Sequence, residues 1–191
     1  MDTIRVSVDV EAGGGDPHDR ALLEIGLSVV GDENNFFEVL FKPDPKEFDR
    51  HALHAIRRPI SEFMERGVEL TIGINQMLDW IDEVSSGKKV EFVGLNMPYD
   101  WMFLKVCVAK VKASNTLPHK AYDIPSYGAG VFRVPLSQTG DARLIQLLGS
   151  QSPELLSKYR LYKDSDRSHK ALEDAMYQAR LLLALEEHAA K

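Results

Sequence analysis

Two carboxylates, Asp9 and Glu11, stand one residue apart at the end of an apolar run near the N-terminus, and glycines occupy residues 13–15. In an extended strand, residues i and i+2 point to the same face, so both acids leave one side of the strand. Like charges held this close repel each other and must be neutralised or protonated. Paired carboxylates suit Mg²⁺ or Mn²⁺. For this pair alone, a metal site and two exposed acids on a sheet edge are both open interpretations.

Two further acids lie on the apolar stripes of expected helices. Asp100 shares its stripe with Phe103 and Cys107, and Asp174 shares one with Leu181. Each acid could simply complement the dipole of a helix N-terminus, which is worth up to about 1 kcal/mol. An acid on a buried stripe is costly unless it is partnered. This placement favours the convergence of both helices' acids on the pair in the N-terminal strand.

His169 precedes Asp174 by five residues, which corresponds to about 140° around a continuous helix. The two side chains would not share a helix face, so we expect His169 in the loop or first turn before the helix. A solvated loop histidine is the simple interpretation of such a residue. Its position beside an acid cluster favours a general base.

The elements that must position these residues follow from hydrophobic periodicity. Strands are expected over residues 4–10, 22–30 and 36–41, with a hairpin turn at 31–35, which makes an antiparallel meander. Two short helices are expected within 42–70. The remaining expected elements are a helix over 74–84, a strand over 90–94, a helix from 98 to 111, a strand over 120–124, a loop over 125–140, a helix over 141–148 and a long helix from 170 onward. On this last helix, Asp174, Gln178 and two leucines share one face. The order predicts a mixed α/β sheet with helices on its faces.

Composition predicts one globular domain spanning residues 1–191, with 44% hydrophobic and 27% charged residues. The net charge of −6 argues against a general nucleic-acid or membrane coat, but it leaves room for a local basic groove. The single cysteine, Cys107, excludes an internal disulfide and is expected to be a buried apolar side chain. No signal peptide or membrane span is visible, so a cytoplasmic protein is expected.

The residues with chemical potential form three ordered motifs. They are Asp9-x-Glu11, then Gly94-x-Asn96-x-x-Tyr99-Asp100-x-x-Phe103-Leu104, then His169-x-Ala171-x-x-Asp174-Ala175. In order and spacing this set resembles the motifs of the DEDDh family of 3′→5′ exonucleases. The resemblance runs from residue 4 to about residue 185.

The resemblance implies an α/β, ribonuclease H-like fold: a five-stranded mixed sheet with flanking helices and an antiparallel second strand. It implies that Asp9, Glu11, Asp100 and Asp174 hold two divalent metal ions, Mg²⁺ or Mn²⁺. It also implies that His169 is the general base for the attacking water. The expected activity is a metal-dependent 3′→5′ exonuclease that releases nucleoside 5′-monophosphates from the 3′ ends of single-stranded DNA or RNA.

The chain departs from the family pattern in two places. The first motif usually has a Thr near Ala12 or Gly13 and then a single Gly, and the second often has a His where this chain has Leu95. We expect these differences to affect substrate contacts and not catalysis. The candidate substrate-binding residues are Ala12, Gly13, Gly14, His54, Asn96, Tyr99 and Arg167.

A basic segment, residues 158–170, carries five Lys/Arg residues before and around His169, interleaved with Tyr159 and Tyr162. It suits phosphate contact and base stacking, or it is a solvated loop with two packed tyrosines. Trp80 and Trp101 lie inside periodic helices and are expected in the core.

Two other functions remain as alternatives. One is a non-catalytic nucleic-acid or protein-binding module on the same fold, which would have no need of all four acids. The other is a ribonuclease H-type endonuclease, which the spacing of His169 disfavours. A homodimer is possible, no membrane partner is expected, and no residue identifies itself as reading the 2′-hydroxyl that separates RNA from DNA.

Overall fold

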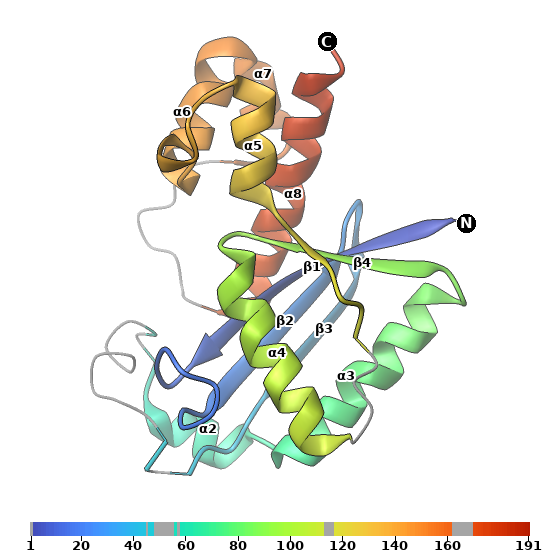
Figure 1. The fold of residues 1–191 in the computed structure, drawn as a ribbon, viewed down its shortest axis with the longest axis vertical. Helices are drawn as coiled ribbons and strands as arrows, with labels where there is room; N and C mark the ends of the chain where they lie inside the picture. Colours follow the sequence, from blue (N-terminus) through green and yellow to red (C-terminus); the bar gives the residue numbers. More distant parts are fainter. Residues whose placement is uncertain (1, 45, 48–55, 57, 113–116, 162–169) are drawn as a thin grey trace.

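The computed structural model describes residues 2–44, 46–47, 56, 58–112, 117–161 and 170–191. Its strands are β1 (Thr3–Ala12), β2 (Leu22–Val29), β3 (Asp32–Leu40), β4 (Lys89–Gly94) and β5 (Ala121–Asp123). They form one sheet in the order β3-β2-β1-β4-β5 (Figure 1). β2 is antiparallel to β1 and β3, whereas β4 is parallel to β1 and β5. The predicted five-stranded mixed sheet with an antiparallel second strand is confirmed.

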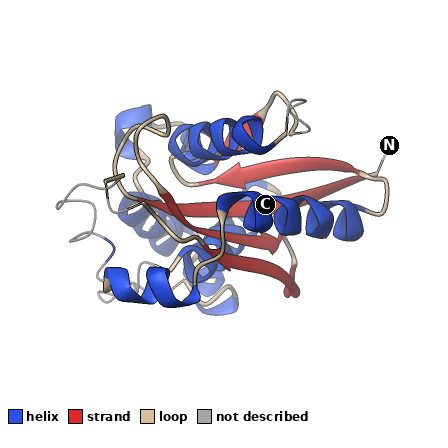
Figure 2. Ribbon diagram, turned by 90° about the horizontal axis from the view of Figure 1, so that it is seen from below, coloured by secondary structure: helices blue, strands red, loops and turns tan. Residues whose placement is uncertain are grey.

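Helices lie on both sides of this sheet (Figure 2). They are α2 (Ile60–Arg66), α3 (Leu70–Ser85), α4 (Met97–Val111), α5 (Ile124–Phe132), the 3₁₀ turn η1 (Leu136–Gln138), α6 (Asp141–Gln151), α7 (Pro153–Lys158) and α8 (Ala171–Ala189). α3 and α4 pack on the face that carries the β1 valines. The opposite face carries Asp9 and Glu11 and is covered by α8. Within the described ranges, no helix has the length and apolar character to cross a membrane.

The expected loop over residues 125–140 is wrong. Its first half is helix α5, followed by η1. Asp123 begins the helix by accepting a hydrogen bond from the Ser126 N–H (2.9 Å). A glycine inside a helix is unusual, but a Cβ at Gly128 would lie 2.5 Å from Cδ2 of Leu144. This glycine therefore allows α5 and α6 to pack closely.

Smaller differences concern element ends. The hairpin turn is shorter than the expected 31–35, because β2 ends at Val29 and β3 begins at Asp32. α3 begins at Leu70 and not at residue 74, and the short helix α7 was not predicted. Within residues 42–70, α2 is one short helix, and residue 56 is also helical; residues 45, 48–55 and 57 lie outside the described residues, so the second expected helix stays a prediction.

The expected burial of Cys107 is confirmed, and both tryptophans pack against the core while remaining partly exposed. Cys107 is 3% exposed, and burial raises the pKa of its thiol to about 11, which disfavours a nucleophilic thiolate. Trp80 packs on Phe37 with ring centroids 6.0 Å apart, and Trp101 packs on Phe92 at 5.2 Å. Both tryptophans contact the main core cluster.

Helix α8 lies directly on the β1–β2 pair. Gly26 is opposite Asp9 in the strand register, and a Cβ at Gly26 would lie 2.1 Å from the backbone carbon of Ala171. The helix side of this contact has small buried residues, Ala175 and Ala179. The close approach brings the first turns of α8, and with them Asp174, over the middle of β1.

We predict that Gly26→Ala lowers the free energy of unfolding by at least about 1–3 kcal/mol, because the added methyl must displace the start of α8. Urea unfolding followed by circular dichroism measures this change. Gly140→Ala is the matched control, since a Cβ there meets open space and its φ of −58° suits any residue. Equal midpoints for Gly26→Ala and the parent would contradict the close contact.

Candidate active site

Asp9 and Glu11 leave the same face of β1, as the alternation of the sequence predicted. β1 continues to Ala12, so Glu11 is held within the strand. The alternating valines, Val8 and Val10, are buried in the core on the other face. The strand therefore separates an apolar side from an acidic side.

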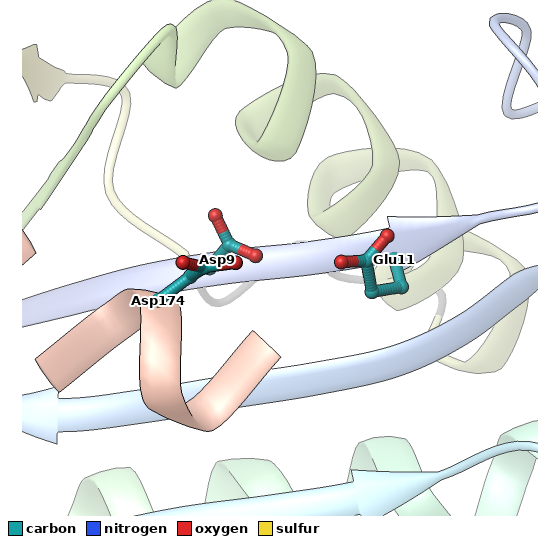
Figure 3. A group of neighbouring side chains, drawn as sticks. All are labelled: Asp9, Glu11 and Asp174. Carbon is teal, nitrogen blue, oxygen red and sulfur yellow. The ribbon is translucent and has the colours of Figure 1, made fainter. Parts of the chain in front are cut away.

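Three carboxylates meet on the acidic side of β1. One oxygen each from Asp9, Glu11 and Asp174 lies within 4.8 Å of the others. Figure 3 shows the first two rising from one strand, with Asp174 coming from the first turns of α8. These three predicted site residues are brought together from opposite ends of the chain.

Asp100 adjoins this group. It is 4% exposed, and its Oδ1 accepts a hydrogen bond from the backbone N–H of Val10 (2.9 Å). The pairing of β4 with β1 stops at Ser7 and Val93, so the Val10 N–H lies beyond the end of β4. If β4 were longer, the Val10 N–H would pair with it; here it donates to Asp100 instead. This hydrogen bond holds the Asp100 carboxylate beside the residue that separates Asp9 from Glu11.

Burial and mutual repulsion disfavour the charged forms of these acids. The pKa of Asp9 is raised well above its usual value, mainly by burial and then by Asp100, Asp174 and Glu11. Burial raises the pKa of Glu11 to about 8, with Glu24 as the next cause. The pKa of Asp100 is raised to about 7 by burial, against the lowering effect of the Val10 N–H. A set of hard oxygen donors under such repulsion fits divalent cations such as Mg²⁺ or Mn²⁺.

Glu24 is a buried acid that the sequence analysis missed. It lies opposite Glu11 in the β1–β2 register and is fully buried. Its Oε2 pairs with Arg58, which also binds Glu62 at 2.7 Å, while its Oε1 has no hydrogen-bond partner among the described residues. An acid inside the apolar run Leu22–Ile25 was the available signal.

Gln178 has no assigned role in the sequence analysis, although its place on the stripe of Asp174 was recognised. Its Nε2 donates to Oδ1 of Asp9 (2.6 Å), and its Oε1 accepts from the backbone N–H of Leu95 (2.8 Å). The first hydrogen bond lowers the pKa of Asp9, against the larger raising effects. The Gln178 amide is therefore a direct hydrogen-bond partner of one of the clustered acids.

The glycine segment after β1 is held and not loose. The Gly13 N–H donates to the Ala21 carbonyl (2.8 Å), and the Tyr99 hydroxyl donates to the Gly14 carbonyl (2.8 Å). Residues 13–15 all lie in the described part of the chain, and none has a positive φ. The candidate substrate residues Ala12, Gly13 and Gly14 are buried.

The other candidate substrate residues differ in accessibility. Asn96 is exposed at the start of α4 in a left-handed conformation (φ 54°, ψ 41°). Tyr99 is half-buried against Phe103. His54, Arg167 and the predicted base His169 lie outside the described residues, so their roles stay predictions.

The described part of the basic segment is paired with acids. Lys158 and Tyr159 both bind Oε2 of Glu187, at 2.5 and 2.7 Å, and Arg160 binds Glu33 at 2.5 Å. These residues lie beside the hairpin that joins β2 to β3. Glu24 lies near the opposite end of β2. Tyr159 packs against neighbouring apolar residues, as one of the two interpretations expects, whereas Lys158 and Arg160 are exposed ion-pair partners. Tyr162 and the residues up to 169 lie outside the described part.

Comparison with known proteins adds independent evidence. No protein-family model matches the chain. The 3′-5′ DNA exonuclease Cap18 of Escherichia coli is 28% identical over 189 residues, which is 98% of this chain and 94% of that protein. This near full-length similarity agrees with the resemblance of the three ordered motifs to the DEDDh family of 3′→5′ exonucleases. The motifs that carry this resemblance are the three that contain the four acids and His169.

Several solved structures share the fold of this chain. The nuclease domain of 3′hExo, described as a DEDDh family member bound to rAMP, has a TM-score of 0.76 at 17% identity, over 96% of this chain and 92% of that one. The Escherichia coli ExoI–ssDNA complex has a TM-score of 0.61 at 14% identity, over 96% and 40%. S. pombe Pop2p, in a Mg²⁺- and Mn²⁺-bound form, has a TM-score of 0.54 at 13% identity, over 93% and 80%. The predicted ribonuclease H-like fold is confirmed.

We predict that the stability of the metal-free protein falls as pH rises from 5 to 9. The folded state keeps protons on acids such as Glu11, whose pKa is raised from 4.5 to about 8, whereas the unfolded state releases them near 4.5. Unfolding is then favoured by rising pH through this window, by an amount on the order of a few kcal/mol. Urea unfolding in a chelating buffer measures the change.

Glu11→Gln is the control for this prediction, because it removes one of the titrating acids and should flatten the pH dependence. Added Mn²⁺ should also reduce the loss at high pH, since a cation binds the charged carboxylates. A stability that is constant between pH 5 and 9 in the parent would contradict the burial of these acids beside one another.

Proposed function

We propose that this chain is a metal-dependent 3′→5′ exonuclease that hydrolyses phosphodiester bonds at the 3′ end of single-stranded nucleic acid and releases nucleoside 5′-monophosphates. The observation that carries the proposal is the convergence of Asp9, Glu11 and Asp174 within 4.8 Å, with Asp100 beside them. The near full-length similarity to a 3′-5′ DNA exonuclease supports the same activity.

The acids would hold two divalent metal ions, Mg²⁺ or Mn²⁺. When bound, such ions neutralise developing charge on the phosphodiester and lower the pKa of water. The chain's own contribution is to fix the carboxylates. The Val10 N–H holds Asp100, and the Gln178 amide holds Asp9. The description of Pop2p as a Mg²⁺- and Mn²⁺-bound form supports this choice of ions.

His169 is proposed as the general base that accepts a proton from the attacking water. What supports this role is its place in the sequence, two residues before the first residue of α8 and five before Asp174. A histidine suits this role because its pKa is near neutral pH, so it is able to take up and release a proton under ordinary conditions.

DNA is the substrate that the comparison favours, since Cap18 is named a DNA exonuclease. A non-catalytic binding module would not require all four acids of the DEDDh set, which disfavours that alternative. Assembly of the chain into a homodimer stays a prediction.

We predict that Asp174→Asn lowers exonuclease activity by more than about 10²-fold, because loss of a metal ligand should exceed the effect of losing an outer partner of a ligand. Stepwise shortening of matched 5′-labelled DNA and RNA oligonucleotides, with Mg²⁺ or Mn²⁺, measures it. Glu173→Gln is the control, since Glu173 directly precedes Asp174 in the first turn of α8 and pairs with Lys170.

Activity of Asp174→Asn equal to that of the parent would show that the site is assigned wrongly. A circular single-stranded DNA tests the endonuclease alternative, because an exonuclease has no end on which to start. Degradation of the circle at the rate of the linear strand would favour the endonuclease.

We predict that His169→Ala lowers the exonuclease rate by about 10²–10⁴-fold while leaving Mn²⁺ affinity unchanged, since a general base acts on the rate and is not a metal ligand. Single-turnover rates and calorimetric Mn²⁺ titration measure the two quantities. Full activity in this variant would reduce His169 to a loop residue.

A further inference from the structure

Gln178 carries a buried amide on α8, one helical turn after Asp174. Its side chain is 3% exposed, and the neighbouring residues on its stripe, Leu181 and Leu185, are fully buried. A buried amide costs free energy unless its donor and acceptor both find partners. The partners of Gln178 therefore indicate why an amide occupies this position.

The two ends of the amide bind different parts of the chain. Nε2 donates to Oδ1 of Asp9 at 2.6 Å, and Oε1 accepts from the Leu95 N–H at 2.8 Å. Leu95 directly follows β4 and leads into α4, which carries Asp100. One side chain thus links β1 and α8, which carry three of the acids, to the connection that leads into α4, which carries Asp100.

The amide fits in only one orientation. The backbone N–H of Leu95 can only donate, so it requires Oε1, and the NH₂ group is left to face Asp9. A carboxylate offers about four lone-pair sites, and this hydrogen bond uses one of them. Gln178 therefore fixes the direction of the Asp9 carboxylate while leaving it able to bind a cation.

Gly94 makes room for this arrangement at the end of β4. A Cβ at Gly94 would lie 3.2 Å from Oε1 of Gln178 and 2.9 Å from the carbonyl oxygen of Val8. The strand end and the amide are therefore in close contact, which restricts the rotation of the Gln178 side chain.

We infer that Gln178 is a positioning residue, which holds Asp9 in the orientation in which Asp9, Glu11 and Asp174 together bind a divalent cation. The inference rests on the proposed metal-dependent function. Gln178 acts through Asp9, in the manner of outer hydrogen-bond partners of metal ligands, whose loss typically weakens metal affinity by about 10–100-fold.

The test is calorimetric titration of the full chain with Mn²⁺. Gln178→Met keeps the length of the side chain and removes both hydrogen bonds, and we expect its Kd for Mn²⁺ to rise by about 10–100-fold. Gln178→Asn keeps the amide but is one methylene too short to span both partners, so its Kd should rise as well. If the methionine variant fails to fold, the Mn²⁺ affinity of Gln178→Asn tests the inference in its place.

Ala184→Gly is the matched control, because it weakens α8 at a buried position away from the acids. It should bind Mn²⁺ as the parent does. The exonuclease rate supplies a second readout: in Gln178→Met, the Mn²⁺ concentration for half-maximal rate should rise, and saturating Mn²⁺ should restore most of the rate.

Parental Mn²⁺ affinity in both Gln178 variants would overturn the inference, and the proposed function would stand if Asp174→Asn still lost metal binding and activity. A parent chain that binds no Mn²⁺ at millimolar concentration and releases no mononucleotides would overturn the proposed function, and the inference with it.

Discussion

Carboxylates that share a buried space lose solvation and repel one another, and this fold holds several of them around the second half of β1. Burial is the largest cause of the raised pKa values of Asp9, Glu11 and Asp100. The protein offsets part of the cost with hydrogen-bond donors, the Val10 N–H for Asp100 and the Gln178 amide for Asp9. On the Glu24 side, Arg58 supplies a positive charge. The remaining electrostatic deficit is what a divalent cation would relieve.

The geometry that concentrates these charges depends on a close contact between backbones. α8 approaches β2 so closely at Gly26 that a methyl group would not fit. Small side chains on the helix, such as Ala175, allow the same approach. A helix at ordinary distance from the sheet would carry Asp174 farther from Asp9 and weaken both the repulsion and the shared cation site. Packing and electrostatics are thus set by the same residues.

The sequence was sufficient for those parts of the site that follow from local periodicity. Alternation along β1 predicted that Asp9 and Glu11 share a face, and the helical stripes predicted that Asp100 and Asp174 turn inward. Helix α5 was missed because Gly128 and its neighbours suggest a loop, whereas the contact with Leu144 that explains Gly128 joins two separate helices. The role of Gln178 was missed for a similar reason. Its partners, Asp9 and Leu95, are known only once α8 is placed against β1 and the end of β4.

The distance along the chain between the members of the site has a consequence for folding. Gln178 and Asp9 are 169 positions apart, so their hydrogen bond closes a loop that contains almost the whole chain. The docking of α8 on the sheet is therefore a step of high contact order, which is intrinsically slow. The repulsion between Asp9 and Asp174 exists only when α8 is docked, so it opposes the docking of the helix and not the pairing of β1 with β2. A divalent cation that bridges these acids would then act on the assembly of the protein as well as on its chemistry, by favouring the docked helix over the open one.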